Sequence, residues 1–559
     1  MREVFSVSDV RAAEAALMEY QRHPDELMQL AARGVAAAAD VMIKDIEAPR
    51  VLVLVGPGGN GGDGLYGTAF LIDKLLTASA DALLVGTSCH ERAKEEFKAS
   101  GGEVINAQTA MERIPDYDLV IDAVAGLASE RHLSEPARGL FRAARHAKIP
   151  VLSIDVPTGI NADNGHHSLN PDDFVTADVT ITFGWLRPAH AFAPECGQVV
   201  LCDLQLPKSP ESFAECLDRL GEPVAYASYE PSLKPSPRIS ATSTYTWPKP
   251  LVYGNPKSVC RGEASIGKVT APQPIGCTGP IADPTPGYYD HKYSLGVVAV
   301  CAGSETYPGA GVLAAAGALG TSGSMVRVIG APDVVRTHPE VVLHPDVASA
   351  GRAQCWVVGP GRGKDRKARA EVAAVLALGI PTILDADALT ILAEDELLRD
   401  AVRAHPLVIL TPHAGEFERL YLAEVGEEMT PNRGENVQRL AKSLNAVVLQ
   451  KGRINVISFR GAPCHTVNCG NSYAATPGSG DVLSGVLGKT IARLNSPMSH
   501  VEDPANCAEV VTELLHGVAI HAHAASVAAE TPDGYAPTTA SRIASALPQA
   551  VARLLSMER

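Results

Sequence analysis

A short glycine-rich segment near the end of the chain carries residue types that phosphoryl chemistry needs. The segment Gly478-Ser479-Gly480-Asp481 precedes the helical pattern VLSGVLGKTIARL. Glycines let a backbone approach a polyphosphate closely, and the free amides at a helix N-terminus stabilise its charge. Asp481 could accept a proton from a hydroxyl that attacks phosphorus, or it could only stabilise the helix dipole. The segment is not a Walker loop, because the spacing and the Lys-Ser/Thr ending are missing.

A second glycine-rich turn lies near the start of the chain. The apolar run VLVLV at 51–55 leads into GPGGNGGDG at 56–64, and residues 65–76 follow with a helical pattern. A strand, a glycine turn and a helix N-terminus bind phosphate in dinucleotide-binding folds. Gly56, Gly58 and Gly61 match that fingerprint, but the second strand ends near Gly86 without the expected acidic residue. A tight turn that binds no phosphate is the alternative.

Four oxygen-bearing side chains follow apolar runs in the same half. Asn60 comes after the run at 51–55, Asp122 closes LVID, Asp155 closes VLSID, and Thr158 follows soon after. Because the carboxyl ends of strands line one crevice in a doubly wound sheet, these side chains could converge there. Oxygen ligands from Asn, Asp and Thr suit a hard cation. Asp155 could instead only cap the turn that follows it.

Alternating strands and helices must position these residues. Helical spacing predicts helices at 7–20 and 24–47, with Ser8 or Asp25 as a cap. Short apolar runs predict buried parallel strands in two series. The first series lies at 51–55, 82–85, 119–121, 151–154 and 179–183, and the second at 297–300, 325–329, 356–358, 382–384, 407–410, 446–449 and 455–457. We therefore expect an α/β protein of two large domains, 1–208 and 286–559, with a Pro/Ser-rich linker at 209–285.

Composition narrows the classes of partner. The 559 residues include 48 Lys and Arg against 63 Asp and Glu, a net charge of −15, which disfavours nucleic acid and anionic membrane surfaces. The eleven cysteines are scattered without a CxxC pair, so neither a zinc site nor a dense disulfide framework is expected. No run approaches ~20 apolar residues, and the start lacks an apolar signal core. We expect a cytoplasmic protein that binds neither nucleic acid nor a membrane.

The N-terminal motifs resemble those of the NAD(P)H-hydrate epimerase family over residues 4–206. The resemblance rests on NGGDG at 60–64, the strand-end aspartates, and the early helices with Glu14 and LMQLAARGVA. It implies a Rossmann-like doubly wound domain in which Asp155 does acid/base work. Asn60, Asp122 and Thr158 would hold a potassium ion. The residues that would contact the hydrated dinucleotide are Gly59, Asn60, Gly61, Gly62, Asp63, Gly126 and Asp155.

The chain departs from this family pattern at three places. Gly59 stands where the family usually has a second Asn, and Thr158 stands where Ser is usual. The loop after Gly126 reads Leu-Ala-Ser, unlike the longer glycine turn of the family. Thr158 keeps the hydroxyl oxygen that a metal needs, whereas the altered loop bears on substrate contacts.

The C-terminal motifs resemble those of the NAD(P)H-hydrate dehydratase family, which has a ribokinase-like fold, over about residues 286–557. The strings are HKYSLG at 291–296, GSETYPGAGVLAAAGAL from 303, GPGRG at 359–363 and TPHAGEFERL at 411–420, together with GSGD. By this resemblance Ala310, Gly361, His413 and Asp481 would line the hydrate pocket, with Asp481 as the catalytic base. The nucleotide would lie against Lys451, Gly452, Gly478, Ser479 and Gly480, and Glu416 would organise magnesium.

Other polar residues of this half permit more than one interpretation. Asp385 and Asp387 in LDADAL follow a strand, where they could cap a helix or belong to the site. Glu416 could be an ordinary glutamate at a helix start, and His413 a structural residue of a turn. His516, His521 and His523 lack the glutamate and spacing of a zinc-binding HExxH motif, so we expect them on a helix surface or in the core.

Both resemblances imply one substrate, a reduced nicotinamide ring that has taken up water at C6. The first domain would interconvert the R and S hydrates, and the second would dehydrate the S form with ADP or ATP. The implied partners are NADH and NADPH hydrates and an adenine nucleotide, and we expect a homo-oligomer. A ribokinase-like kinase for a small molecule such as a vitamin precursor is the alternative, with a non-catalytic nucleotide-binding module in front.

Overall fold

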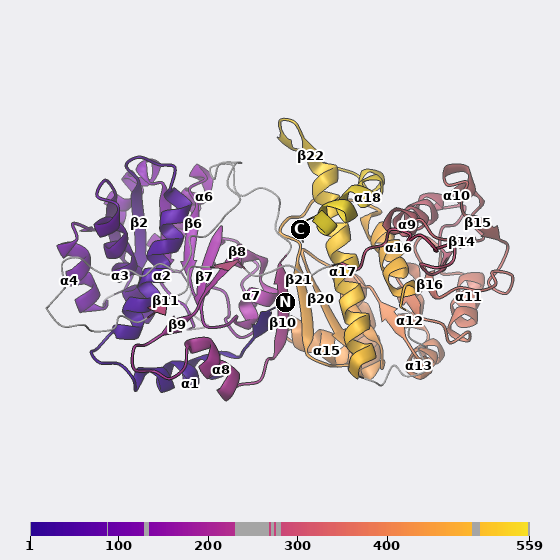
Figure 1. The fold of residues 1–559 in the computed structure, drawn as a ribbon, viewed down its shortest axis with the longest axis horizontal. Helices are drawn as coiled ribbons and strands as arrows, with labels where there is room; N and C mark the ends of the chain where they lie inside the picture. Colours follow the sequence, from indigo (N-terminus) through magenta and orange to yellow (C-terminus); the bar gives the residue numbers. More distant parts are fainter. Residues whose placement is uncertain are drawn as a thin grey trace. The chain divides into compact units, whose positions relative to one another are not determined.

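The computed structural model describes residues 2–86, 88–127, 133–229, 268–269, 273–274, 281–494 and 504–556. The chain forms two compact units, which we call the N-terminal unit, built on Arg2–Ala227, and the C-terminal unit, built on Gly276–Arg559 (Figure 1). Most of the expected linker, along with Ala128 and Ser129 of the altered loop, lies outside the described residues. The expected linker range begins with a described helix and strand, α8 and β10.

The N-terminal unit is built on a parallel sheet with the order β8-β7-β6-β5-β2-β3-β4, and β12 pairs antiparallel with β8. The strands are β2 (Arg50–Val55), β3 (Ser79–Leu84), β4 (Glu103–Ile105), β5 (Leu119–Ala123), β6 (Val151–Ile154), β7 (Val179–Phe183), β8 (Gln198–Cys202) and β12 (Gln273–Pro274). Two antiparallel pairs are β1 (Arg2–Val4) with β10 (Ala225–Tyr229), and β9 (Leu204–Gln205) with β11 (Lys268–Val269).

Helices cover both faces of this sheet. They are α1 (Val7–Met18), α2 (Glu26–Ile43), α3 (Gly59–Lys74), α4 (Glu91–Ala99), α5 (Ala107–Glu112), α6 (Glu135–Ala147), α7 (Pro188–Phe192) and α8 (Phe213–Leu220), with 3-10 turns at Ile114–Asp116 and Pro194–Cys196. Val51, Val53 and Val55 of β2 pack in the core that includes α1 to α4, whereas Leu52 and Leu54 pack in the core with α5 and α6. Burial on both faces explains why the strands are continuous apolar runs.

The C-terminal unit contains a larger sheet. Its strands have the order β21-β20-β19-β18-β17-β16-β13-β14-β15, parallel from β15 to β19 and antiparallel from β19 to β21. They are β13 (Val298–Cys301), β14 (Val326–Ile329), β15 (Val342–His344), β16 (Cys355–Val358), β17 (Thr382–Leu384), β18 (Val408–Leu410), β19 (Val447–Gln450), β20 (Ile454–Phe459) and β21 (Cys464–Asn468). A small hairpin joins β22 (Glu530–Thr531) to β23 (Gly534–Tyr535).

Helices flank this sheet as well, and α9, α16, α17 and α18 pack against one another (Figure 1). The helices are α9 (Pro308–Thr321), α10 (Pro332–Thr337), α11 (Arg366–Leu376), α12 (Asp387–Glu394), α13 (Glu396–Ala404), α14 (Ala414–Val425), α15 (Arg433–Ser443), α16 (Ser479–Ala492), α17 (Pro504–Ala529) and α18 (Ala540–Ser556). None of the helices in the described ranges is long and apolar enough to cross a membrane.

Each sheet has a point where the chain order reverses. In the N-terminal unit the reversal lies between β2 and β5, and in the C-terminal unit it lies between β13 and β16. Ligands of open α/β sheets bind outside the carboxyl ends of the strands at such points. Gly56 and Val124 follow β2 and β5 directly, and Ala302 and Gly359 follow β13 and β16.

The predicted α/β class, with a doubly wound parallel sheet in the N-terminal unit, is confirmed. All twelve predicted strands overlap observed strands. Three local expectations are wrong. The helix expected from Leu65 begins at Gly59, Ser6 rather than Ser8 caps α1, and Asp25 precedes α2 without a side-chain capping bond.

Candidate active sites

The N-terminal crevice holds a cavity of about 530 Å³ at the carboxyl ends of β2, β5 and β6. Helix α1 contributes one face with Arg11, Glu14 and Met18, at the spacing that places side chains on one side of a helix. The start of α3 and the strand ends contribute Gly58, Gly59, Asn60, Asp63, Val124, Ala125, Gly126, Leu127 and Asp155. Of the predicted hydrate contacts, Gly59, Asn60, Asp63, Gly126 and Asp155 thus line one cavity, while Gly61 and Gly62 are buried in α3.

Asp122 and Thr158, two of the predicted potassium ligands, are in direct contact. The Thr158 hydroxyl donates to Asp122 Oδ1 at 2.7 Å, and the Thr158 amide donates to Oδ2 at 2.9 Å. Ser153 donates to the same carboxylate at 3.0 Å. Asp122 is fully buried, and burial raises its pKa, an effect that these hydrogen bonds oppose. All donors to this carboxylate among the described residues are neutral, so its charge lacks a basic partner there.

Asn60, the third predicted ligand, borders the same region. Its amide nitrogen donates to the Ile154 carbonyl at 2.9 Å, which fixes the orientation of the side chain. The amide oxygen lies against Gly126, where a Cβ would approach it to 2.5 Å. Only a glycine at 126 therefore leaves this oxygen accessible. A carboxylate, a hydroxyl and an amide oxygen form a donor set that suits a hard cation.

Asp155 is held by a network that its motif did not reveal. Its φ of +63° is left-handed, which is rare outside glycine. Arg187, fully buried, pairs with Asp155 Oδ1 at 3.2 Å, and the Thr182 hydroxyl donates to the same oxygen at 3.2 Å. His190 Nε2 donates to the Asp155 carbonyl at 2.6 Å. Burial, with Arg187 nearby, lowers the pKa of His190 to about 3, so the ring is a neutral donor.

Two more carboxyl groups border this cavity. Burial raises the pKa of Glu14 to about 7, and the charge of Asp155 adds to the rise, while Arg187 and Arg11 oppose it. Burial also raises the pKa of Asp63 well above its usual value, with further contributions from Asp155 and Glu14. The cavity therefore combines one carboxylate paired with arginine and two carboxyl groups that bind protons readily.

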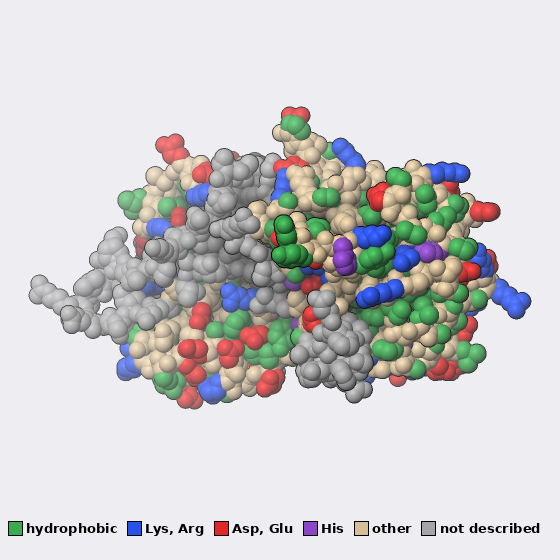
Figure 2. All heavy atoms as spheres, turned by 45° about the vertical axis from the view of Figure 1, so that its right-hand side comes forward, with side chains coloured by type: hydrophobic (Ala, Val, Ile, Leu, Met, Phe, Trp, Pro, Cys, Tyr) green, Lys and Arg blue, Asp and Glu red, His purple; other side chains and the backbone are tan. Residues whose placement is uncertain are grey.

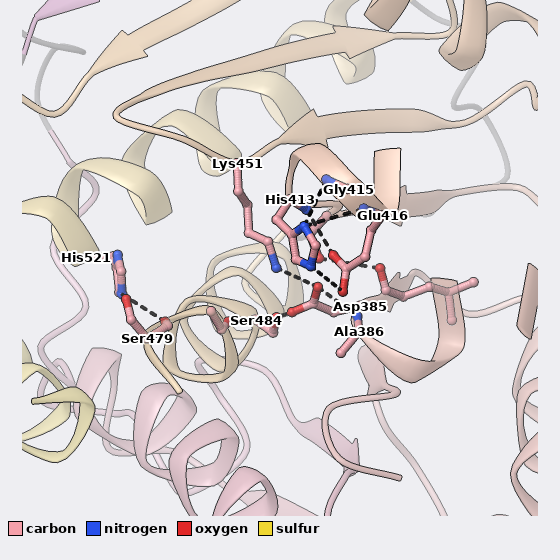
Figure 3. Close-up of polar contacts among 12 residues, drawn as sticks. Asp385, Ala386, His413, Gly415, Glu416, Lys451, Ser479, Ser484 and His521 are labelled. Atoms are coloured by element: carbon pink, nitrogen blue, oxygen red, sulfur yellow. Dashed lines mark hydrogen bonds and ion pairs between the residues drawn. The ribbon is translucent and has the colours of Figure 1, made fainter. Parts of the chain in front are cut away.

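In the C-terminal unit, Lys451 and Ser484 converge on Asp385 (Figure 3). Lys451 Nζ lies 2.7 Å from Asp385 Oδ1, and the Ser484 hydroxyl donates to Oδ2 at 2.5 Å. Asp385 follows β17, Lys451 follows β19 and Ser484 lies on α16, so three elements meet at one buried carboxylate. Asp385 thus lies beside the predicted nucleotide contact Lys451, and the residue that caps α12 is Ala386. Asp387 instead accepts from the Gly363 amide at 2.8 Å.

Asp481 lies in the first turn of α16, beside this network. Its pKa is raised to about 7. Burial is the largest cause, Asp385, Asp387 and Glu416 add to the rise, and Lys451 opposes it. Gly478, the residue before the helix, has a φ of +82°, a conformation that favours glycine. The carboxyl group of Asp481 therefore exchanges its proton near neutral pH, as a general base must.

His413 and Glu416 form a capping box at the start of α14 (Figure 3). His413 Nδ1 accepts from the Gly415 amide at 3.1 Å, and the His413 amide donates to Glu416 Oε2 at 2.9 Å. The Glu416 carboxyl group is largely buried and contributes to the field at Asp481. Both residues thus have a structural role at the helix start, and both lie at the carboxyl end of β18 with the other site residues.

A cavity of about 550 Å³ lies next to Lys451 and the glycine loop. Four predicted nucleotide contacts line it, Lys451, Gly452, Ser479 and Gly480, and so does His413. A Cβ at residue 480 would lie 3.2 Å from Lys451 Nζ, so the glycine lets the ammonium approach the helix start. Other polar lining residues are Arg453, Asn455, Asn471, Ser472 and Thr476. The size and the clustered cation and amides suit a nucleotide.

Ala310 and Gly361 meet at the reversal point of this sheet. Gly361 has a φ of +58°, and a Cβ there would lie 2.6 Å from that of Ala310. Arg362 fixes the loop by pairing with Glu371 at 2.6 Å and by donating to the Gly303 carbonyl at 2.9 Å. Neither residue lines the cavity beside Lys451, so the predicted hydrate contacts Ala310 and Gly361 lie apart from the predicted nucleotide contacts.

Sequence reasoning missed several residues of both sites. Arg187 and His190 occur in WLRPAH, shortly after β7, and this string carries no motif that indicates their role. Helix α1 was expected, but the cavity-facing role of Glu14 was not. His521 was expected on a helix surface or in the core, and it is buried with its Nε2 donating to the Ser479 carbonyl at 3.1 Å. Burial lowers its pKa to about 4.

Comparisons with known proteins identify the family. The family model described as YjeF-related protein N-terminus matches residues 24–189, and the one described as NAD(P)H-hydrate dehydratase matches residues 298–548. The bifunctional NAD(P)H-hydrate repair enzyme Nnr of Corynebacterium glutamicum is 37% identical over 99% of both chains. This chain belongs to the bifunctional NAD(P)H-hydrate repair enzymes. The motif resemblances stated for the two halves are thereby confirmed.

Other bifunctional NAD(P)H-hydrate repair enzymes align over most of their length. The Nnr protein of Mycobacterium tuberculosis is 37% identical, and the alignment covers 88% of this chain and 89% of that protein. The Nnr protein of Mycobacterium leprae is 34% identical over 99% of this chain. A solved structure of ADP/ATP-dependent NAD(P)H-hydrate dehydratase from Bacillus subtilis, co-crystallised with ATP and Mg²⁺, is 26% identical, with coverage of 48% of this chain and 94% of that chain and a TM-score of 0.40.

Proposed function

We propose that this enzyme repairs NADH and NADPH that have taken up water at C6 of the nicotinamide ring. The N-terminal unit interconverts the R and S hydrates, and the C-terminal unit dehydrates the S hydrate at the expense of ADP or ATP. The observation that carries the proposal is the presence, in a chain of this family, of one cavity in each unit beside a carboxyl group whose pKa is raised to about 7. Glu14 lines the cavity of the N-terminal unit, and Asp481 directly follows Gly480, which lines the cavity of the C-terminal unit.

In the N-terminal unit, Asp155 is the acid/base residue. Arg187 and His190 hold its carboxylate and its strained backbone in place. The dinucleotide is received at the start of α3 and after β5. The residues are Gly59, Asn60, Asp63 and Gly126, which line the cavity, with Gly61 and Gly62 buried in the first turns of the same helix. Asn60, Asp122 and Thr158 would hold potassium, since the buried Asp122 carboxylate has only neutral donors among the described residues. A bound potassium ion would neutralise that charge and fix the strand ends around the cavity.

In the C-terminal unit, Asp481 is the base. It takes the proton of the C6 hydroxyl as the hydroxyl oxygen attacks the terminal phosphorus of the nucleotide, and the bond to the remaining nucleotide breaks. Phosphate is a better leaving group than hydroxide, so its loss from C6, with loss of a proton from C5, restores the dihydronicotinamide ring. Ala310, Gly361 and His413 orient the hydrate.

Binding of the nucleotide falls to the glycine loop and to Lys451. Lys451 neutralises phosphate charge, and Gly452, Gly478, Ser479 and Gly480 let the phosphates approach the amides of α16. Glu416 would hold water bound to magnesium, because its carboxylate keeps lone pairs free beyond the capping bonds. A bound magnesium ion would screen the charge of the transferred phosphoryl group.

We further propose that the enzyme acts in the cytoplasm as a homo-oligomer, with domains at 1–208 and 286–559 around a linker at 209–285. Reduced nicotinamide cofactors and adenine nucleotides share that compartment, which supports the location. Light scattering during size-exclusion chromatography measures the subunit number directly. A mass equal to one chain at assay concentration would contradict the homo-oligomer.

The decisive experiment uses chemically prepared NADH hydrate with both epimers present. The enzyme is incubated with ADP or ATP, Mg²⁺ and K⁺, and the absorbance of the reduced nicotinamide is followed, with a control that lacks nucleotide. We expect recovery of both epimers only when nucleotide is present. No recovery with either nucleotide would overturn the proposal, and accumulation of a stable phosphorylated product would favour a small-molecule kinase instead.

A further inference from the structure

We propose that Glu14 of helix α1 is the second acid/base residue of the epimerase, acting as the partner of Asp155 in the same cavity. This inference rests on the proposed epimerisation. The chemistry requires two groups, one that accepts a proton and one that donates a proton. A single carboxyl group such as Asp155 is either ionised or protonated, so it can be either the acceptor or the donor at one time but not both.

The substrate defines both tasks. Carbon C6 of the hydrate bears a hydroxyl and is bonded to N1, so it is a cyclic carbinolamine. A base removes the hydroxyl proton, the oxygen forms a C=O double bond, and the C6–N1 bond breaks with its electron pair going to N1. An acid then supplies a proton to N1. Rotation about C5–C6 presents the other face of the aldehyde, and the reverse steps close the ring and return both protons.

Asp155 is the member of the pair that is held by an arginine. Its Oδ1 lies 3.2 Å from the guanidinium of the fully buried Arg187, and Thr182 donates to the same oxygen. Its main chain is fixed by the bond from His190. Because an arginine remains charged throughout the physiological range, Asp155 keeps a fixed cation beside the oxygen that Thr182 also contacts. Asp155 is therefore the base, and the proton that N1 needs must come from another group.

Glu14 has the geometry for the acid. Val10, Ala13 and Leu17 anchor α1 in the core, so that the neighbouring face of the helix, with Glu14, is presented to the cavity. Arg11 ties this helix to the altered loop by donating to the Leu127 carbonyl at 3.1 Å. Among the described residues, none donates a hydrogen bond to the Glu14 carboxyl group. Glu14 lines the cavity, and within the described part of the chain its carboxyl group is not tied to a structural hydrogen bond.

The electrostatic surroundings favour Glu14 over the other carboxyl group of the cavity. The charged groups that act on Glu14 are Arg11 on α1, Asp63 on α3, Asp155 after β6 and Arg187 before α7. Burial raises the pKa of Glu14 and the Asp155 charge adds to the rise, while Arg187 and Arg11 oppose it. The resulting pKa of about 7 lets Glu14 release and regain a proton at neutral pH. Burial, with Asp155 and Glu14 nearby, raises the pKa of Asp63 well above its usual value, which favours its protonated form. Paired carboxyl groups in opposite protonation states mark an acid and a base.

The test compares Glu14→Gln with the unaltered full-length enzyme. Epimerisation is followed without nucleotide, with K⁺ present, by chromatographic separation of the R and S hydrates. We expect kcat to fall by about 10²-fold or more while KM changes little, because glutamine keeps the shape but transfers no proton. Glu19→Gln is the matched control, since Glu19 is exposed at the end of the same helix and does not line the cavity. Dehydration of the S hydrate by Glu14→Gln should equal that of the unaltered enzyme.

A second variant protects the test against a simple folding defect. The unaltered enzyme should lose epimerase kcat as pH rises through about 7, because the acid must be protonated. Arg11 lowers the pKa of Glu14, so in Arg11→Gln the fall of epimerase kcat should occur at higher pH. If Glu14→Gln keeps a normal kcat and the same fall of kcat with rising pH, the assignment of Glu14 is overturned, while the proposed epimerase function stands. An unaltered enzyme that does not interconvert the epimers at all would overturn the proposed epimerase function itself.

Discussion

Two carboxyl groups of this enzyme have a pKa near 7 for the same physical reasons. Burial raises the pKa of both Glu14 and Asp481, and a neighbouring aspartate raises it further, Asp155 in one case and Asp385 in the other. Nearby cations oppose each rise, Arg187 and Arg11 at Glu14 and Lys451 at Asp481, so each group can still lose its proton near neutral pH. The consequences are opposite, because an acid must be protonated and a base must be ionised.

Asp481 should therefore impose a rising pH dependence on dehydration. The base is inactive when protonated, so kcat/KM for the S hydrate should increase as pH rises through about 7 and then level off. Removing the Asp385 charge in Asp385→Asn should shift the rise to lower pH. Initial rates across pH 5.5 to 9, in buffers of constant ionic strength, measure the midpoint. A flat profile would argue against Asp481 as the base.

Lys451 should act mainly on nucleotide affinity. Its ammonium neutralises phosphate charge but transfers no proton, so Lys451→Ala should raise the apparent KM for ATP by more than it lowers kcat. A loss of one charge-assisted contact, worth ~2 kcal/mol, corresponds to about 30-fold in KM. Lys442→Ala on α15, outside the nucleotide cavity, is the control. Equal nucleotide KM values for Lys451→Ala and the unaltered enzyme would exclude the predicted placement.

Asp122 tests the proposed cation site. Asp122→Ala removes the buried carboxylate that Thr158 and Ser153 contact, so epimerisation and its response to added K⁺ should both be lost or fall sharply. The control is Asp116→Ala, since the Asp116 side chain is 62% exposed and lies away from the cavity. Rates in K⁺, in Na⁺ and in a large organic cation separate the two variants. Persistence of a potassium response in Asp122→Ala would contradict the site.

At the scale of elements, close backbone contacts explain where sequence reasoning was incomplete. The start of α3 was expected at Leu65, because glycine is a poor helix former. The helix instead begins at Gly59. Its first turns need glycine, because a Cβ at Gly61 would lie 2.1 Å from the Gly56 carbonyl and one at Gly64 would lie 2.4 Å from the Ala123 Cβ. Helix propensity describes an isolated helix. It does not take into account that the ends of β2 and β5 lie in close contact with the start of α3.

The predictable strands were those buried on both faces. Runs such as VLVLV at β2 and VIL at β18 are apolar throughout, as burial on two faces requires. Strand β21, CHTVN, and strand β15, VLH, mix polar and apolar residues and were missed. The Asp155 network was missed for a related reason. Arg187 reaches Asp155 because β7 pairs with β6, a contact that spacing along the chain does not encode.

The crossing of α9 and α16 offers a test at this scale. A Cβ at Gly485 would lie 2.0 Å from the Ala314 carbonyl, and one at Gly317 would lie 2.1 Å from the Val482 carbonyl. Gly485→Ala should force the helices apart and destabilise the C-terminal unit by ~1 to 3 kcal/mol. Gly309→Ala, at a position of α9 with open space around it, should not. Thermal inactivation of dehydration measures the effect, and equal inactivation temperatures for the two variants would refute the packing argument.

At the scale of the whole molecule, each unit has its own sheet and its own core. The buried side chains of Arg2–Ala227 and of Gly276–Arg559 fall in separate hydrophobic clusters. On the face of the C-terminal unit shown in Figure 2, acidic and basic side chains are mixed among apolar ones, without one continuous charged patch. The residues proposed for each reaction therefore all lie within one unit.

The two activities should consequently separate by single substitutions. Asp481→Asn keeps the size and the hydrogen bonding of the side chain but removes the base, a loss of ~10² to 10⁴ in rate. That variant should lose nucleotide-dependent dehydration and still interconvert the R and S hydrates. Asp155→Asn removes the base of the N-terminal cavity and weakens the pair with Arg187. It should convert the S hydrate fully and leave the R hydrate to the slow spontaneous exchange.

Chromatographic separation of the two hydrates over time, with and without nucleotide, measures both outcomes in one assay. The variants control for each other, because a folding defect confined to one unit leaves the other reaction intact. Circular dichroism of both variants checks that the fold is retained. If either folded variant loses both activities, the two reactions cannot belong to two independent sites. Residues of one unit would then have to contribute to the reaction of the other.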